Sequence, residues 1–253
     1  MRTRHEVYVD GIALSSIHPG ILITDIAHSP ARKALMTQQI ANRQGMRVID
    51  SRREEARVGI TFELRIYKAQ QRQEVLQKIQ QWCQGKILET NDREGQRLFA
   101  ICSEEPYISS VTKWTVPLTI EFSAYEKPFW ENKTYSSCTM SGSSAQKTLF
   151  VPGNAGTACV EAVITPSETI TELTVTVGDT FIELEDLSTS DVISIGYDEN
   201  GNQFIKAGET SILGNRTAES SDDLLAVCGK KSTVSVSADK SVNAVIKARG
   251  LWL

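Results

Sequence analysis

Residues 58–85 read VGITFELRIYKAQQRQEVLQKIQQWCQG and carry the clearest pattern in the sequence. Over 58–67 apolar and polar residues alternate strictly, which is the period of a strand with one buried face. Over 69–84 the apolar residues recur at helical spacing, and mostly glutamine, lysine and arginine fill the other positions, so an amphipathic helix is predicted. Gly85 stands where a left-handed C-cap is expected to end that helix.

The apolar faces of this strand and this helix must be buried together, because neither face is stable in water alone. We therefore expect Trp82 and Ile79 to pack on the sheet that contains Phe62 and Leu64. Pro117 predicts an edge position or a bulge in the strand that contains it. Further strands are predicted over 7–14, 86–90, 97–102 and 107–125. Residues 1–130 are thus expected to form a sheet-rich domain with one helix.

The second half of the chain, residues 131–253, has no helical period and reads as β structure throughout. Serine and threonine dominate 131–145, which fits either a linker or an exposed first strand. The other strands are predicted over 146–151, 159–165, 172–177, 180–184, 191–196, 203–207, 233–238 and 242–248. Many short strands separated by turn residues are typical of an antiparallel sandwich. The predicted fold class is mainly β with one α-helix, in two β-sandwich domains.

Composition and charge exclude several classes of protein. The chain has 253 residues, 40% of them hydrophobic and 23% charged, with a net charge of −4, so a strongly basic nucleic-acid binder is not expected. No apolar run approaches the roughly 20 residues of a membrane-spanning helix, and we see no secretion signal. Synthesis in the cytoplasm as a soluble product is expected. The part up to Lys127 carries 18 basic and 15 acidic residues and the rest 9 and 16, which supports two domains with different surfaces.

No catalytic, cofactor-binding or metal-binding residues are predicted. The three histidines lie within the first 28 residues, and no serine has a GxSxG elbow around it. Nothing fits a phosphate-binding glycine loop, and the five scattered cysteines form neither a CxxC pair nor a cluster with histidine. Residues 198–209 match part of a calcium loop, but Gln203 occupies the position that needs glycine, so a hairpin is the better interpretation.

Residues 31–57 are polar and basic, and the sequence leaves their secondary structure open. Gly45 between extended stretches suggests the tip of a long hairpin, although 31–41 fit a helix equally well. The arginines of this segment alternate with apolar or acidic residues and are Arg43, Arg47, Arg52, Arg53 and Arg57. They form either a solvated face or a subunit interface, where their planar forks would pair with carboxylates. They are the candidate interface residues.

The order of elements resembles the distal tail protein (Dit) family of long-tailed, non-contractile bacteriophages. Three passages carry the likeness. They are the strand and helix over 58–67 and 72–82, the stretch FSAYEKPFW over 122–130, and the ending RGLWL over 249–253.

The resemblance implies a structural virion protein without enzymatic activity or cofactors. Its N-terminal sandwich, with one helix and an extended hairpin, would form a homohexameric ring, and its C-terminal domain would be a galectin-like sandwich outside that ring. Such rings join the tail tube protein to the tail-tip protein and act as the hub of the adsorption apparatus, so the implied location is the virion tail tip. Receptor-binding or baseplate proteins are further implied partners. Whether the last strand returns to the first domain stays open.

A carbohydrate-binding module that attaches the particle to the host envelope is the alternative function. It draws on the C-terminal sandwich, but a fold alone does not establish a function. Galectins hold sugar with a histidine, asparagine, arginine and a stacking tryptophan. The second domain has no histidine, and Trp130 and Trp252 lie at its boundaries, which puts the usual galectin site in doubt. A glycoside hydrolase is the least supported hypothesis, because acidic pairs are common on any acidic β domain.

Overall fold

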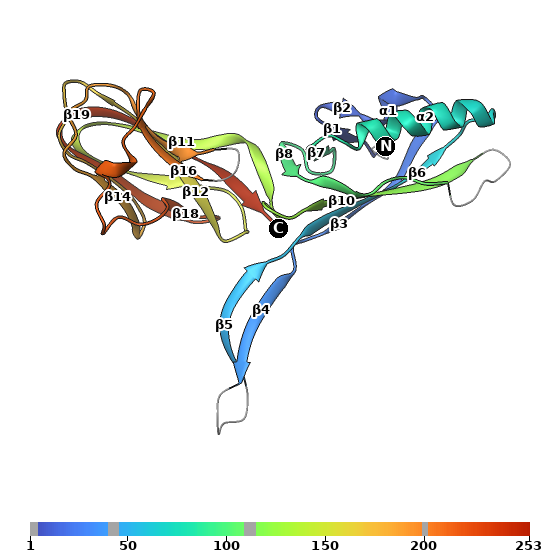
Figure 1. The fold of residues 1–253 in the computed structure, drawn as a ribbon, viewed down its shortest axis with the longest axis horizontal. Helices are drawn as coiled ribbons and strands as arrows, with labels where there is room; N and C mark the ends of the chain where they lie inside the picture. The colour runs from blue at the N-terminus through green and yellow to red at the C-terminus, as the bar shows by residue number, and fades with distance from the viewer. Residues whose placement is uncertain (1–4, 40–45, 109–114, 199–201) are drawn as a thin grey trace. The chain divides into compact units, whose positions relative to one another are not determined.

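The computed structural model describes residues 5–39, 46–108, 115–198 and 202–253. Contacts divide the chain into two compact units, Met1–Glu131 with Leu253, and Asn132–Trp252. Each unit is considered by itself (Figure 1). The fold is mainly β, as predicted, and no helix of the described residues is both long and apolar enough to cross a membrane.

The first unit is built from two sheets, a helix and a two-stranded ribbon. In one sheet, β1 pairs with β2 and β7, and β7 pairs with β8. The other sheet has the order β3-β6-β10-β9. The strands are β1 (Val7–Val9), β2 (Ile12–Ala13), β3 (Ile21–Ser29), β6 (Ala56–Leu64), β7 (Ile87–Thr90), β8 (Gln96–Phe99), β9 (Ile101–Glu104) and β10 (Val116–Ala124). The helices are α1 (Leu14–Ile17), a single turn that the sequence did not predict, and α2 (Ala69–Trp82).

The predicted strand and amphipathic helix are confirmed by β6 and α2. Alternate residues of β6 are buried, and α2 buries Val75, Leu76, Ile79 and Trp82. The Trp82 ring meets Phe122 of β10 edge to face at 5.9 Å, and its Nε1 donates to the Ile12 carbonyl over 2.7 Å. Phe122 lies on the strand next to β6 in the four-stranded sheet. The helix therefore packs on the sheet whose apolar pattern predicted it.

Gly85 has a different role from the predicted one. Glycines with positive φ occur elsewhere in the described chain, but Gly85 is not one of them, so it forms no left-handed cap. A Cβ at this position would lie 2.3 Å from Cγ1 of Val9 and 2.5 Å from Oδ2 of Asp10. A side chain at this position would displace the side chains of Val9 and Asp10, and the Asp10 carboxylate accepts from the Lys86 and Ile87 amides next to it.

The structure also tests the predictions for the segment 31–41, for the strand over 97–102 and for Pro117. Of the segment 31–41, residues 33–39 form the extended strand β4 (Lys33–Gln39), and residues 40–41 lie outside the described residues. The strand predicted over 97–102 breaks between β8 and β9 at Ala100. Pro117 stands opposite Glu63 of β6, and β9 pairs with β10 only from residue 121 onward, so Pro117 lies where β10 has a described partner on one side, which fits the predicted edge position.

In its described residues the second unit has strands and one short 3-10 helix, Leu213–Asn215. Its strands are β11 (Trp130–Phe150), β12 (Thr157–Pro166), β13 (Leu173–Val177), β14 (Thr180–Leu184), β15 (Ile193–Tyr197), β16 (Gln203–Ala207), β17 (Thr210–Ser211), β18 (Leu225–Val227) and β19 (Lys231–Trp252). The strand β12 pairs antiparallel with β19, β13 with β14 and β15 with β16, and alternate apolar side chains of the strands meet in one core.

Two very long strands replace shorter predicted ones in this unit. The serine-rich stretch 131–145 is a mostly exposed strand, as one of the two alternatives predicted, and not a linker; β11 runs from it without a break into the strand predicted over 146–151. The strands predicted over 233–238 and 242–248 are likewise one strand, β19. The first part of β19 pairs with β13 and the second part with β12, so the strand holds two parts of the unit together.

Candidate assembly surface

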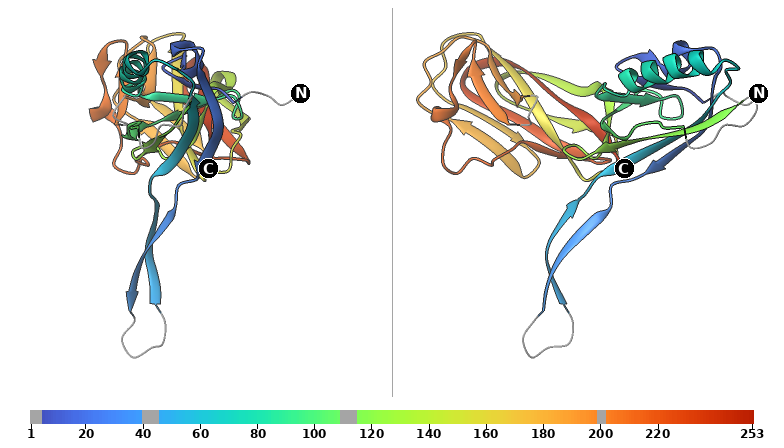
Figure 2. Two further views of the ribbon diagram at one scale, coloured as in Figure 1. Left: turned by 90° about the vertical axis from the view of Figure 1, so that its right-hand side faces the viewer. Right: turned by 45° about the vertical axis from the view of Figure 1, so that its right-hand side comes forward.

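The ribbon is the pair of strands β4 and β5 (Met46–Arg53), which leaves the first unit between β3 and β6 (Figure 1). The strands pair antiparallel from Lys33 opposite Arg53 to Gln39 opposite Met46. The register shifts after Met36, because Ile49 is inserted as an extra residue in β5. Figure 2 shows the two strands crossing, the strong twist typical of a two-stranded ribbon. Such a ribbon is marginally stable by itself in water.

The ribbon exposes large apolar side chains. The exposed fractions are 53% for Leu35, 61% for Met36, 51% for Val48 and 56% for Ile49. Leu35 and Met36 are adjacent in an extended strand and therefore point to opposite faces. Neither face of the ribbon is thus covered by the described part of its own chain. Apolar side chains gathered on a projecting element are typical of a surface that contacts another protein.

The five candidate arginines do not share one environment. Arg52 and Arg53 are exposed on β5, and Nη1 of Arg53 also donates to the Ala31 carbonyl over 2.9 Å. Arg57 lies on β6, where it pairs with Glu55 and, over 3.3 Å, with Glu121. Arg47 is on β5 opposite Gln38, and Arg43 lies outside the described residues. Arg52 is the candidate whose described side chain is best placed for a partner.

The Arg57 pairs belong to the fold of this chain. The hydrogen bond from Arg57 lowers the pKa of the Glu55 carboxyl group and raises the pKa of Arg57 itself. Both side chains are accessible to solvent, so this pair contributes little to stability. The pair with Glu55 nevertheless occupies the Arg57 guanidinium. Arg57 is therefore a weaker candidate for an intermolecular contact than Arg52.

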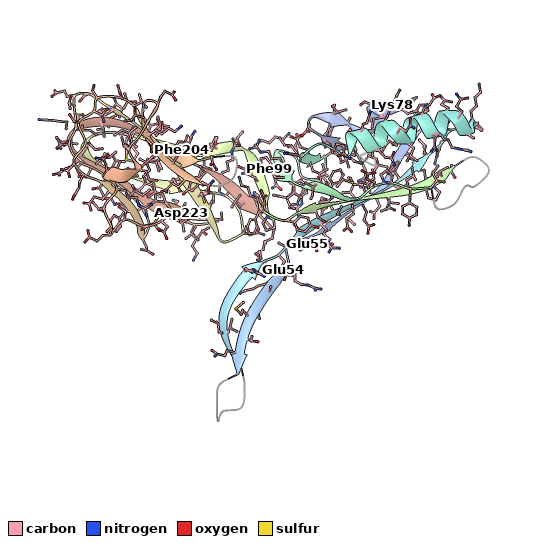
Figure 3. All side chains as sticks on the ribbon, in the orientation of Figure 1. Glu54, Glu55, Lys78, Phe99, Phe204 and Asp223 are labelled. Atoms are coloured by element: carbon pink, nitrogen blue, oxygen red, sulfur yellow. The ribbon has the colours of Figure 1, made fainter. Side chains whose placement is uncertain are left out.

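A hollow of about 460 Å³ lies where the ribbon joins the body of the first unit. Figure 3 marks Glu54 and Glu55 at this place. Both signs of charge line the hollow, whose residues are Ser29, Pro30, Arg32, Glu54, Glu55 and Arg57. Its charged side chains make it unlike the mostly apolar pockets that hold small molecules.

A surface of opposite charge lies along β9. This strand is last in the order of its sheet, so among the described strands its outer edge has no partner. Ile101 is 54% exposed, and Glu104 and Glu105 are exposed next to it. Glu105 accepts from Nε2 of Gln84 over 3.1 Å. An edge strand with unpaired backbone groups is a template for pairing with another chain.

The histidines serve local structure. Nδ1 of His18 accepts from the Gly20 amide over 2.9 Å within a turn. Nε2 of His28 lies 2.7 Å from the Asp92 carboxylate, and its ring meets Trp130 edge to face at 5.4 Å. In the described part of the chain no three histidine, cysteine or acidic side chains gather as metal ligands would.

The loop that partly matches a calcium site is closed by its own hydrogen bonds. The Asn202 amide donates to Oδ1 of Asp198 over 2.8 Å, and the Asp198 amide donates to the Asn202 carbonyl. Residues 199–201 between them lie outside the described part of the chain. These bonds join the ends of the loop between β15 and β16, as the hairpin interpretation predicts.

Three aromatic side chains bear on the carbohydrate-binding alternative. Trp130 is 3% exposed, and Nε1 of the half-buried Trp252 donates to the Asn132 side chain over 2.9 Å. Tyr135 is covered by cations, with the Arg249 guanidinium 3.8 Å and the Lys247 ammonium 4.6 Å from the ring centre. Trp130 is thus buried, and Trp252 and Tyr135 are each engaged by side chains of this chain.

Sequence reasoning found the basic residues of this surface and missed the rest. The only signals for the apolar part were the adjacent pairs Leu35-Met36 and Val48-Ile49, which have no strand period. Nothing in the sequence distinguished Glu104 and Glu105 from other surface acids, because their edge position depends on the strand order.

Comparison with known proteins was made by sequence and by structure. No protein-family model matches the chain, and no curated protein matches it in sequence. The structure is similar to that of the SPP1 Dit protein, described as a paradigm of the hub adsorption apparatus in phages that infect Gram-positive bacteria. The TM-score is 0.73 at 10% identity, over 98% of this chain and 99% of that chain. A chain of the phage P2 baseplate in its activated conformation with calcium matches with a TM-score of 0.51 at 11% identity, over 99% of this chain and 98% of that chain. The resemblance inferred from the sequence is confirmed at the level of the fold.

Proposed function

We propose that this chain is a phage distal tail protein, a structural and non-catalytic component of the virion that forms the hub of the tail tip. The observation that carries the proposal is the end-to-end likeness to the SPP1 Dit protein, since 98% of this chain and 99% of that chain align with a TM-score of 0.73. At 10% identity the likeness concerns the fold, so the function is an inference from it. The site residues described above supply the independent support.

The proposed assembly is a homohexameric ring. A ring requires two different surfaces on each subunit, because a head-to-tail contact repeated about an axis closes into a cycle. The ribbon, with its exposed apolar residues and Arg52, is the first surface. The edge of β9, with Ile101, Glu104 and Glu105, is the second, because it is acidic where the ribbon is basic and also carries an exposed apolar residue. The ribbon of one subunit would lie against this edge of the next.

Within the virion, one face of such a ring would meet the tail tube protein and the other the tail-tip protein, with receptor-binding or baseplate proteins attached outside. The second unit would be a galectin-like domain on the outer side of the ring and would act in docking. Synthesis would take place in the host cytoplasm, followed by incorporation at the tail tip. An antibody against the chain should label the tail tip of intact particles in electron micrographs.

The direct test is the mass of the purified full chain in solution. Light scattering after size-exclusion chromatography should give about six times the 28.0 kDa of one chain at low salt, and negative-stain images should show six-fold rings. A strictly monomeric chain, both alone at high concentration and mixed with the tube protein of the same phage, would overturn the proposal.

A further inference from the structure

Two of the five cysteines lie together although 18 residues separate them in the sequence. Cys83 is buried at the C-cap of α2, and Cys102 is half-buried on β9. The two side chains are near enough for each to shift the pKa of the other, and Sγ of Cys102 also donates to the Glu104 carbonyl over 3.3 Å. Both are free thiols in the structure. A buried cysteine usually serves only as a small apolar residue, and that role does not require a second cysteine beside it.

The segments that carry the two thiols are held against each other by contacts on both sides. Before Cys83, the Trp82 ring packs edge to face on Phe122, and Phe122 is the residue opposite Cys102 in the pairing of β10 with β9. After Cys83, the Gln84 side chain donates to the Glu105 carboxylate over 3.1 Å. The approach of the thiols is therefore fixed by the packing of α2 on the sheet and by a polar contact beyond it.

The environment makes the two thiols chemically different. The contact with Cys102 and, after it, burial raise the pKa of Cys83. The same contact lowers the pKa of Cys102 in spite of partial burial. Cys102 is the more accessible of the two thiols and the one whose pKa is lowered, so it is the one assigned to attack an oxidant. This arrangement matches an attacking cysteine next to a resolving one.

We propose that Cys83 and Cys102 form a reversible disulfide when the folded chain meets a disulfide oxidant such as oxidised glutathione. The Cys102 thiolate attacks one sulfur of the oxidant, which forms a mixed disulfide and releases one glutathione thiolate. Cys83 then gives up its proton and attacks the Cys102 sulfur, so the protein disulfide forms and the second glutathione leaves. The protein loses two electrons and two protons, and the oxidant is reduced to two thiols. This inference does not depend on the proposed function.

The bond would connect the end of α2 to the edge strand β9. It would close a loop from residue 83 to residue 102 and so restrict the unfolded chain. We expect the oxidised protein to have a Tm higher by roughly 5 °C or more than the reduced protein. Reduction by a dithiol should return the Tm to its starting value.

The experiment treats the reduced, folded full chain with oxidised glutathione at pH 8, while circular dichroism verifies that it stays folded. Thiols are then counted after denaturation, and linked peptides are identified by mass spectrometry. We expect a single linked pair joining residue 83 to residue 102, with a mass lower by two hydrogens than the two reduced peptides together. The Cys83→Ser variant should stop at the mixed disulfide and gain the mass of one glutathione on Cys102.

The matched control is Cys159→Ser, which removes an exposed thiol of the second unit and should form the disulfide like the wild type. Retention of five thiols by the folded wild type would overturn the proposal. So would a linked pair other than 83 with 102, or a wild-type chain that keeps the glutathione adduct on Cys102. Because peptide mapping of the wild type answers the question by itself, a variant that fails to fold does not remove the test.

Discussion

Trp82 illustrates how much one side chain contributes when packing and hydrogen bonding coincide. It is 7% exposed, contacts Phe122 and donates to the Ile12 carbonyl, so it connects α2 to both neighbouring sheets of the first unit. We expect Trp82→Ala to lower the free energy of unfolding by about 3–5 kcal/mol. Trp82→Phe is the control, because it retains a ring and loses the indole donor, and it should cost about 1–3 kcal/mol. Urea unfolding measures both, and equal stability of Trp82→Ala and wild type would contradict this role.

Gly85 shows what the sequence can and cannot predict about a single residue. Its position after an amphipathic helix correctly predicts where the helix ends, since α2 stops at Trp82. The reason for the glycine could not be predicted, because it lies in the approach of Val9 and Asp10, more than 70 residues earlier in the chain. Local patterns report local conformation, whereas close approach between distant segments depends on the tertiary fold.

Elements with one buried face were the predictable ones. The strand β6 and the helix α2 follow from their apolar periods because the core enforces those periods. The ribbon has no such period, since no core of its own chain covers either face, and the sequence consequently left helix and hairpin open. A strand pair without such a period, with apolar residues on both faces, is what we expect of a surface that another chain would cover. The arginines could be found by composition, but their division into free and engaged residues required the structure.

The ribbon supplies the prediction at the level of an element. Replacing Leu35 and Val48 together by serine should weaken self-association at least about tenfold, because their exposed apolar area would no longer be buried between subunits. The monomer should keep its Tm, since both side chains are already exposed. Val192→Ser, which alters a 41% exposed apolar residue of the second unit, is the matched control. Sedimentation at several concentrations measures the change, and unaltered association of the double variant would exclude the ribbon from the interface.

For the whole molecule, the proposed ring predicts a complementary pair of charge reversals. Arg52→Glu and Glu104→Arg should each weaken the assembly, and the double variant should recover much of the loss, because the pair regains opposite charges. Arg53 is unsuitable for this test, since its contact with the Ala31 carbonyl gives it a role within the chain. Raising salt should weaken the wild-type assembly in the same direction. Native mass spectrometry provides the measurement, and a double variant no better than the worse single one would refute this pairing of surfaces.

The strand β19 has a consequence for how the protein is made. The chain leaves the ribosome from residue 1 onward, and the described strands and helices of the first unit precede residue 132. That unit can acquire nearly all its structure during translation. In the second unit, β11, β12 and β13 all find a neighbour in β19, which is synthesised after each of them. Until residues 231–252 have been synthesised, the edges of β11, β12 and β13 that pair with β19 have unpaired backbone groups. The second unit can therefore complete its fold only at the end of translation, and until then it must be protected from aggregation.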